Sequence, residues 1–356
     1  MVAWFLGGVM KESVARNHHF ISQAEQRLNA IDKTVKKKNQ RIFKFEVLCR
    51  EPPSLRAGPP SGVRIEDNLS RLDLYALSVL GNGQQYNLED AFGQYENDSS
   101  SVVRSIFEKL DSSCTEALGE ELRRLYALKL LNMIRNPYAI KRTLKMFSEL
   151  NGAVPRDEKL RAHFESFRGA SRPQIVKTCA EFDVSEGEYI AWLNILYLVI
   201  LQPVQGKMNL LEALMHSLFS NPDAIKSFTV HRYTDLDKGI LLCDQMIDLE
   251  YGEGVKQQMF NLDSSSFVVV LLIEAKKQGF FPLGPELQAV NLRQDNLIHV
   301  GQEINNMAML GAFNRHCVYL ASSSVFCAFD TPYGIAVAPQ DLPDKNSDSS
   351  AASNSA

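Results

Sequence analysis

The sequence lacks the short patterns that identify many metal-binding and nucleotide-binding proteins. Its six cysteines include no C-x-x-C pair, and no histidine and cysteine have the spacing of a zinc module. There is no phosphate-binding loop, no dinucleotide-binding glycine pattern, no H-E-x-x-H motif and no G-x-S-x-G elbow. These absences argue against the commonest classes of zinc protein, nucleotide-binding protein and serine hydrolase. The cysteines are predicted to be buried free thiols in a reducing compartment.

Long hydrophobic runs are also missing. The longest, Tyr189–Leu201, has thirteen residues and includes Asn194, which suits a buried helix better than a bilayer span of about 20 residues. The first ten residues are apolar but lack the basic segment of a secretory signal. We therefore expect residues 1–16 to be an N-terminal extension, with Met10 as the alternative start of the chain. The protein is predicted to be soluble and cytoplasmic, with no membrane contact.

Charge is nearly balanced over the whole chain but unevenly spread. The formal net charge of −4 argues against a surface that is adapted to nucleic acid over its whole extent. Residues 1–60 nevertheless carry eleven Lys or Arg against five Asp or Glu, and much of this excess lies in Lys33–Lys44. Such a segment could meet phosphate, which makes nucleic acid a candidate partner. It could equally be a solvated turn between a helix and a strand.

Periodicity predicts a strand near the beginning of the chain and a long helical region after it. Ser22 and Glu25 have the spacing of a capping box, which predicts a helix over 22–31. Alternating apolar and polar residues predict a strand from Arg41, whereas the prolines and glycines of 51–62 predict an irregular loop. Helical spacing begins at Leu88. The helices expected beyond it cover about 115–135, 157–168, 172–182, 186–202 and 207–219.

Strand character returns after residue 222. Phe267–Ile273 is a run of seven apolar residues, which predicts a strand buried on both faces. A further helix is expected over 296–313 and a strand over 317–321. The prediction is an α+β fold, with a mixed or antiparallel sheet built from N- and C-terminal strands and a large helical insertion at 88–220. We expect one domain over 17–340, followed by a disordered tail at 341–356.

Two adjacent histidines, His18 and His19, immediately precede the first predicted helix. The positive end of a helix dipole lowers the pKa of a nearby imidazole, and a neutral imidazole suits a general base or a metal ligand. Adjacent side chains of an extended segment point in opposite directions, so only one of the two would face a site. The alternative is a pair of hydrogen-bonded histidines that pack against the start of the helix.

The segment Asn17–Gln23 resembles the opening of an uncharacterised bacterial and phage family. Its members begin with two histidines, two apolar residues and a proline before a helix. Here Ser22 stands where the family has proline, and either residue can start a helix. A family strand that ends in Ser-Asp-Asn-Pro corresponds to Leu242–Gln245, which keeps only Asp244. Other similar segments are the early strand at 41–45, the tyrosine segment at 73–75, the paired-glutamate helix with Glu89 and Glu96, and the asparagine helix and closing strand at 303–319.

The resemblance singles out His18, His19, Asp244 and Asn305 as polar residues at the ends of elements. A histidine and an aspartate there could form an acid–base or metal site, and the function expected is hydrolysis of phosphodiester bonds. Asp244 could instead form a turn, and Asn305 could bridge to a neighbouring strand. The alternative function is a non-catalytic protein-binding or scaffold protein in a mobile-element or defence context. The sequence identifies neither a cofactor nor a metal.

Overall fold

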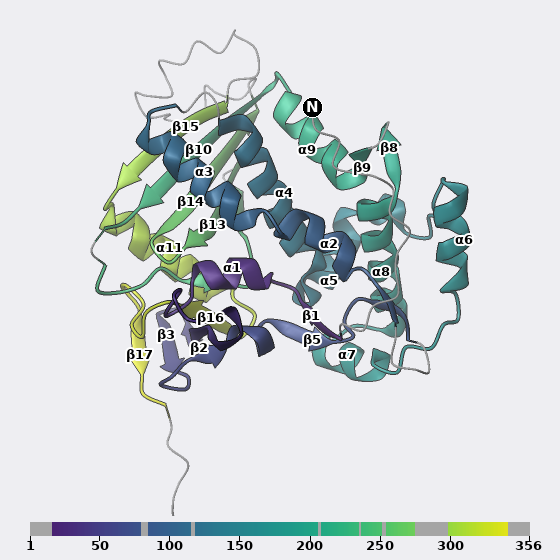
Figure 1. The fold of residues 1–356 in the computed structure, drawn as a ribbon, viewed down its shortest axis with the longest axis horizontal. Coiled ribbons are helices and arrows are strands. Elements are labelled where there is room, and N and C mark those ends of the chain that lie inside the picture. The colour runs from purple at the N-terminus through teal and green to yellow at the C-terminus, as the bar shows by residue number, and fades with distance from the viewer. Residues whose placement is uncertain are drawn as a thin grey trace, which may run out of the picture.

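The computed structural model describes residues 16–79, 85–114, 118–205, 208–234, 236–250, 254–274 and 298–340. Within these residues the fold is α+β, as predicted, and helices pack against two larger sheets (Figure 1). The predicted tail at 341–356, and all of the predicted extension except Arg16, lie outside the described residues.

The N-terminal segment forms the helix and the strand that its sequence predicts. Strand β1 (Asn17–His19) pairs antiparallel with β5 (Ser70–Leu72). Helix α1 (Gln23–Leu28) follows at once, and the Ser22 side chain accepts a hydrogen bond from the Glu25 backbone N–H at 3.1 Å. A turn then leads into strand β2 (Arg41–Arg50).

The prediction of an irregular loop over 51–62 is wrong, because strand β3 (Pro53–Ala57) lies within it. This strand pairs antiparallel with β2 and parallel with β17 (Ala336–Ala338). Pro53 is tolerated because it is the first residue of the strand. Leu55 is fully buried. The turn residues of this segment therefore flank a short strand and do not replace it.

The helical region follows the predicted pattern, with shorter elements. The helical spacing that begins at Leu88 covers two separate helices, Glu89–Glu96 and Ser99–Asp111. Asn136 caps the turn that follows α4, accepting a hydrogen bond from the Tyr138 backbone N–H at 3.0 Å. The helices are α2 (Glu89–Glu96), α3 (Ser99–Asp111), α4 (Gly119–Arg135), α5 (Ile140–Met146), α6 (Glu158–Ser166), α7 (Ile175–Phe182), α8 (Glu186–Leu201) and α9 (Leu210–Ser220). Short strands β6 (Ala76–Val79), β7 (Gln85–Asn87), β8 (Pro203–Gln205) and β9 (Met208–Asn209) flank them.

No single helix of the described residues has the length and hydropathy to cross a bilayer. Helices α7 and α8 meet that criterion only when they are taken together, and they are bent by 97° at their junction.

A five-stranded sheet follows the helical region, with the strand order β12–β13–β14–β10–β15. Strand β15 runs parallel to β10, and the other pairs are antiparallel. Val268 and Val270 of β14 face the core shared with the helices, whereas Phe267 and Val269 face the core shared with α11. The apolar run of β14 is therefore buried on both faces, as predicted. The bounds are β10 (Ala224–Arg232), β12 (Ile247–Glu250), β13 (Val255–Asp263), β14 (Ser266–Glu274), β15 (Ile298–Ile304) and α11 (Met307–Leu320).

The helix predicted over 296–313 is wrong in part, and the strand predicted over 317–321 is wrong, because residues 317–320 lie in a helix. Residues 298–304 form β15, and the helix begins at Met307 and continues to Leu320. Val300 and Ile304 are four residues apart, a spacing that one face of a helix and one face of a strand both allow. Pairing with β10 decides the outcome. The closing strand is β16 (Ser324–Cys327).

Early and late strands share the second large sheet, as the sequence predicts. Its order is β11–β16–β2–β3–β17, where β11 is Leu242–Cys243, and β4 (Val63–Arg64) pairs with β2 beside it. Helix α11 contacts strands of both large sheets. The six cysteines are free, and four of them are buried, whereas Cys49 and Cys114 are exposed. The prediction of buried thiols is therefore wrong for these two.

Candidate functional site

The two histidines of β1 are both buried in contacts of their own. Nδ1 of His18 accepts the backbone N–H of Tyr75 at 2.8 Å, and the two rings stack with centroids 5.7 Å apart. Nε2 of His18 lies 3.1 Å from the side-chain amide nitrogen of Gln85. Nε2 of His19 lies 3.1 Å from the Glu66 carbonyl oxygen, and burial lowers the pKa of His19. These contacts fix both rings.

Asp244 and Asn305 lie in different surroundings from the histidines. Oδ1 of the buried Asp244 accepts the Ser322 backbone N–H at 3.1 Å, and burial raises the pKa of this carboxyl group. Asn305 is exposed, and its side chain holds Thr234 through hydrogen bonds of 2.9 and 3.0 Å. The four predicted site residues therefore form hydrogen bonds with different partners, and none of these bonds joins one of them to another.

The structure instead brings a different set of polar residues together between α1, α2 and α4. We call this set the polar network. Its members are Glu25, Glu89, Glu96, Lys129, Asn132 and Arg135. The three residues from α4 are spaced three apart, so they lie along one side of that helix. This helix is buried on most sides, which is why its polar residues find partners inside the protein.

The first half of the polar network joins α1 to α4. Lys129 forms an ion pair with Glu25, and its ammonium group also donates to the Asn261 carbonyl oxygen at 2.8 Å. Asn132 donates to the other carboxylate oxygen of Glu25 at 2.6 Å. Each oxygen of Glu25 thus has a donor, as a buried carboxylate requires.

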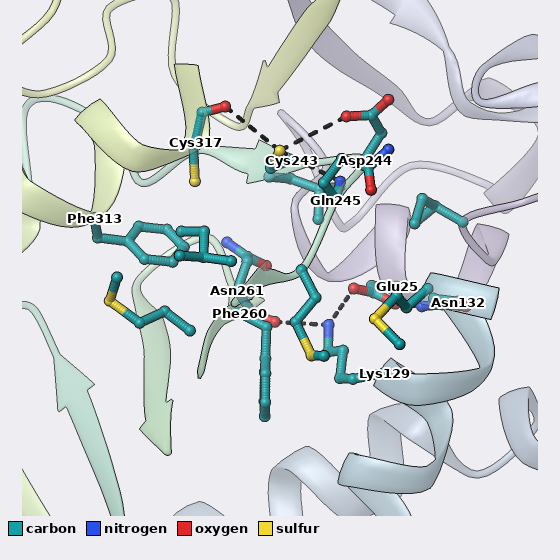
Figure 2. Close-up of a pocket in the computed structure, with 16 residues that line it drawn as sticks. Glu25, Lys129, Asn132, Cys243, Asp244, Gln245, Phe260, Asn261, Phe313 and Cys317 are labelled. Atoms are coloured by element: carbon teal, nitrogen blue, oxygen red, sulfur yellow. Dashed lines mark hydrogen bonds and ion pairs between the residues drawn. The ribbon is translucent and has the colours of Figure 1, made fainter. Parts of the chain in front are cut away.

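This half of the network borders a cavity of about 20 Å³, which is room for about one water molecule. Figure 2 shows Glu25, Lys129 and Asn132 on one side of the cavity and Cys243, Asp244 and Gln245 on another. Burial raises the pKa of the Cys243 thiol well above its ordinary value, so this thiol is a poor nucleophile. A cavity of this size does not admit a substrate.

The second half of the polar network centres on the fully buried Arg135. Its Nη2 donates to the Asn132 side-chain oxygen at 2.8 Å, and its Nη1 forms an ion pair with Glu96. The guanidinium also lies over the Phe92 ring, 5.1 Å from the centroid. Burial acts to lower the pKa of Arg135, but Glu96 and other neighbours raise it overall. The guanidinium therefore stays charged.

Glu89 is the member of the network that titrates near neutrality. Burial raises the pKa of its carboxyl group to about 8, Arg135 acts to lower it, and Glu96 acts to raise it further. The backbone N–H of His19 donates to this carboxyl group, whereas Oε1 is enclosed with no hydrogen-bond partner among the described residues. Glu89 therefore carries a proton at neutral pH that it can give up.

Glu89 and Glu96 are partly exposed as residues, although one carboxylate oxygen of each is enclosed. Glu89 is half-buried, and the Glu96 side chain is 19% exposed. They are seven residues apart on α2, two turns of one helix face. Two carboxyl groups in different environments, one protonated and one paired with a guanidinium, are the arrangement that acid–base catalysis uses. No group of three or more His, Cys, Asp or Glu in the described part of the chain is placed to hold a metal ion.

The sequence contained a signal for this cluster. Lys129, Asn132 and Arg135 are polar residues at a spacing of three in the otherwise apolar second half of α4, residues 125–135, and such residues need buried partners. In the sequence, Glu89 and Glu96 are singled out only by the family resemblance described above. The partners on α1 and α2 are distant in the chain, so periodicity alone could not identify them.

Replacing Glu89 should reveal its shifted pKa through stability. The folded-state pKa of about 8 lies above the ordinary value of 4.5, so the folded protein binds more protons than the unfolded chain between these values, and stability falls as pH rises. Glu89→Gln removes the titrating carboxyl group and with it this fall of stability with rising pH. We expect the variant to be more stable than the wild type at pH 8 and similar to it near pH 4.5. The difference between the two proteins in the free energy of unfolding should grow by less than about 1.4 kcal/mol per pH unit, because Glu89 is partly solvated.

Urea denaturation at several pH values measures this difference. Glu108→Gln, at an exposed glutamate of α3, is the matched control and should show no such trend. A stability difference that is constant from pH 4.5 to pH 8 would contradict the shifted pKa.

Comparison of the chain with family models, with curated proteins and with solved structures gave no match.

Proposed function

We propose that the protein is a hydrolase that acts on phosphodiester bonds, with Glu89 and Glu96 as its acid and base. The observation that carries the proposal is the Glu89 carboxyl group, which is protonated at neutral pH beside a second carboxylate on the same helix face. Glu89 and Glu96 are partly exposed as residues, whereas His18 is fully enclosed. The acid–base pair is thus assigned to α2 and not to His18 or His19 with Asp244.

The reaction assigned to this pair is a single displacement by water. Glu96 accepts a proton from the attacking water, whose oxygen forms the new bond to phosphorus. The bond from phosphorus to the leaving oxygen breaks, and that oxygen takes the proton of Glu89. Arg135 acts as a positioning residue, because it is buried behind Glu96 and holds that carboxylate through the ion pair. The products are an alcohol and a phosphomonoester.

The test is the hydrolysis of the dinucleotide thymidylyl-(3′→5′)-thymidine, whose alkoxide leaving group needs a proton, by the wild type, Glu89→Gln and the exposed control Glu108→Gln. We expect Glu89→Gln to lower kcat by about 10²–10⁴-fold, the usual contribution of a general acid. The control should match the wild type. The wild-type kcat should fall above about pH 8, where Glu89 loses its proton. No turnover by the wild type, or an unchanged rate in Glu89→Gln, would reject the proposal.

The second candidate is a non-catalytic binding or scaffold protein. It is favoured by the hydrogen bonds of His18, His19 and Asp244, which have the character of structural contacts. The exposed apolar side chains of Leu72 and Val176, which are 57% and 69% exposed, also suit a protein that meets a partner. Under this candidate the wild type would hydrolyse the diester no faster than Glu89→Gln.

A further inference from the structure

The turn between α1 and β2 presents four lysines to solvent. Lys33, Lys36, Lys37 and Lys38 are all exposed, and we call residues 33–38 the lysine turn. The rest of the basic segment is committed elsewhere. Arg41 donates to the carbonyl oxygens of Ser61 and Gly62 at 2.8 Å each, and Lys44 is only half-exposed.

Hydrogen bonds at both ends hold the lysine turn in one conformation. The buried Gln40 donates through its amide to the carbonyl oxygens of Lys33 and Val35, at 3.2 and 3.4 Å. Oδ1 of Asp32 accepts from the backbone N–H and the hydroxyl of Thr34, at 2.8 and 2.6 Å. Binding a partner would therefore cost little conformational entropy, because the backbone of the lysine turn is already ordered.

Among the described residues, most of the positive charge of the lysine turn is not offset, although the Asp32 carboxylate bonds to the turn. None of its four lysines forms an ion pair among the described residues, and the Lys33 ammonium donates to the neutral hydroxyl of Ser264 at 2.9 Å. The nearest 3-10 turn, Ile65–Asp67, contacts it and carries two carboxylates. Both of these pair with Arg64. The lysines therefore keep a local excess of positive charge.

We propose that the lysine turn binds the phosphate backbone of nucleic acid. The choice of nucleic acid rests on the proposed function, because a hydrolase of phosphodiester bonds acts on this polymer. Four exposed lysines on one turn concentrate positive charge, which binds phosphates without base recognition. Such binding weakens as salt rises, because each phosphate contact releases condensed counterions.

The experiment measures the fluorescence anisotropy of a labelled 25-base-pair DNA duplex at 50–200 mM NaCl. All proteins carry Glu89→Gln, so that the DNA stays intact while binding is measured. The test variant adds Lys36→Gln, Lys37→Gln and Lys38→Gln. The matched control adds Lys145→Gln, Lys159→Gln and Lys177→Gln, three exposed lysines of the helical region, so both triples change the net charge equally.

We expect the lysine-turn triple to weaken binding at least tenfold at 50 mM NaCl. The slope of log K against log salt should become shallower by about 2–3, since each lost phosphate contact contributes about 0.9. The control triple should bind like its parent. Equal loss in both triples, no loss in either, or binding of phosphatidylserine vesicles but not of DNA would overturn the inference.

The outcomes also separate this inference from the proposed function. Binding that depends on the lysine turn, without any hydrolysis by the wild type, would leave the inference standing and reject the hydrolase. Hydrolysis that depends on Glu89, with binding unaffected by the lysine-turn triple, would support the hydrolase and reject the lysine turn as the binding surface.

Discussion

Arg135→Ala is expected to lower the free energy of unfolding by about 3–5 kcal/mol, the range for breaking a buried ion pair by removing one partner. The guanidinium is fully buried and links Glu96, Asn132 and Phe92. Its removal leaves the Glu96 carboxylate without a counter-charge in a poorly solvated place. It also leaves the Asn132 oxygen without its donor. Urea denaturation followed by tryptophan fluorescence measures the loss.

The control for this prediction is Arg168→Ala. Arg168 pairs with Glu165 at 3.1 Å, and the two side chains are 67% and 40% exposed. Exposed pairs contribute about 0–1 kcal/mol, because water and salt screen them. If Arg168→Ala cost as much as Arg135→Ala, the central role given to Arg135 would be wrong.

Lys129→Met is expected to cost about 3–5 kcal/mol for the related reason that it strands a buried carboxylate. Glu25 would keep its hydrogen bond from Asn132 but lose its only cationic partner. Adding Glu25→Gln removes the stranded charge and keeps an acceptor for Asn132. The double variant should therefore regain at least half of the loss, although the Asn261 carbonyl oxygen still lacks its donor.

A double-mutant cycle from urea denaturation measures this coupling. The two single variants and the double variant are compared with the wild type at one pH. Single losses that simply add in the double variant would show that Glu25 and Lys129 do not act as a pair.

These two predictions concern residues whose importance depends on their neighbours. The sequence marks Lys129 and Arg135 as polar residues in the apolar second half of α4, but it does not identify the residues that they contact. Their partners come from α1, α2 and β13, and Lys129 and Asn261 are 132 residues apart. Contacts over such separations depend on how the whole core packs, so local patterns do not encode them.

The predicted His/Asp site illustrates the same difference. The sequence places His18 and His19 correctly, just before a capped helix, because caps act within a few residues. Their partners, Tyr75 and Glu66, lie 57 and 47 residues further along the chain. Whether a histidine is catalytic or structural depends on those partners, and the sequence gives no distance to either.

The sequence by itself determined the α+β class, the helical region that follows Leu88 and the double burial of β14. These follow from periodicity, capping and composition, which are local properties of the chain. Only the tertiary structure decided that 298–304 is a strand. Its residues allow both helical and strand spacing, and pairing with β10 stabilises the strand. The tertiary structure also decided that Glu89 is protonated near neutrality, because its pKa depends on burial and on charges from α4.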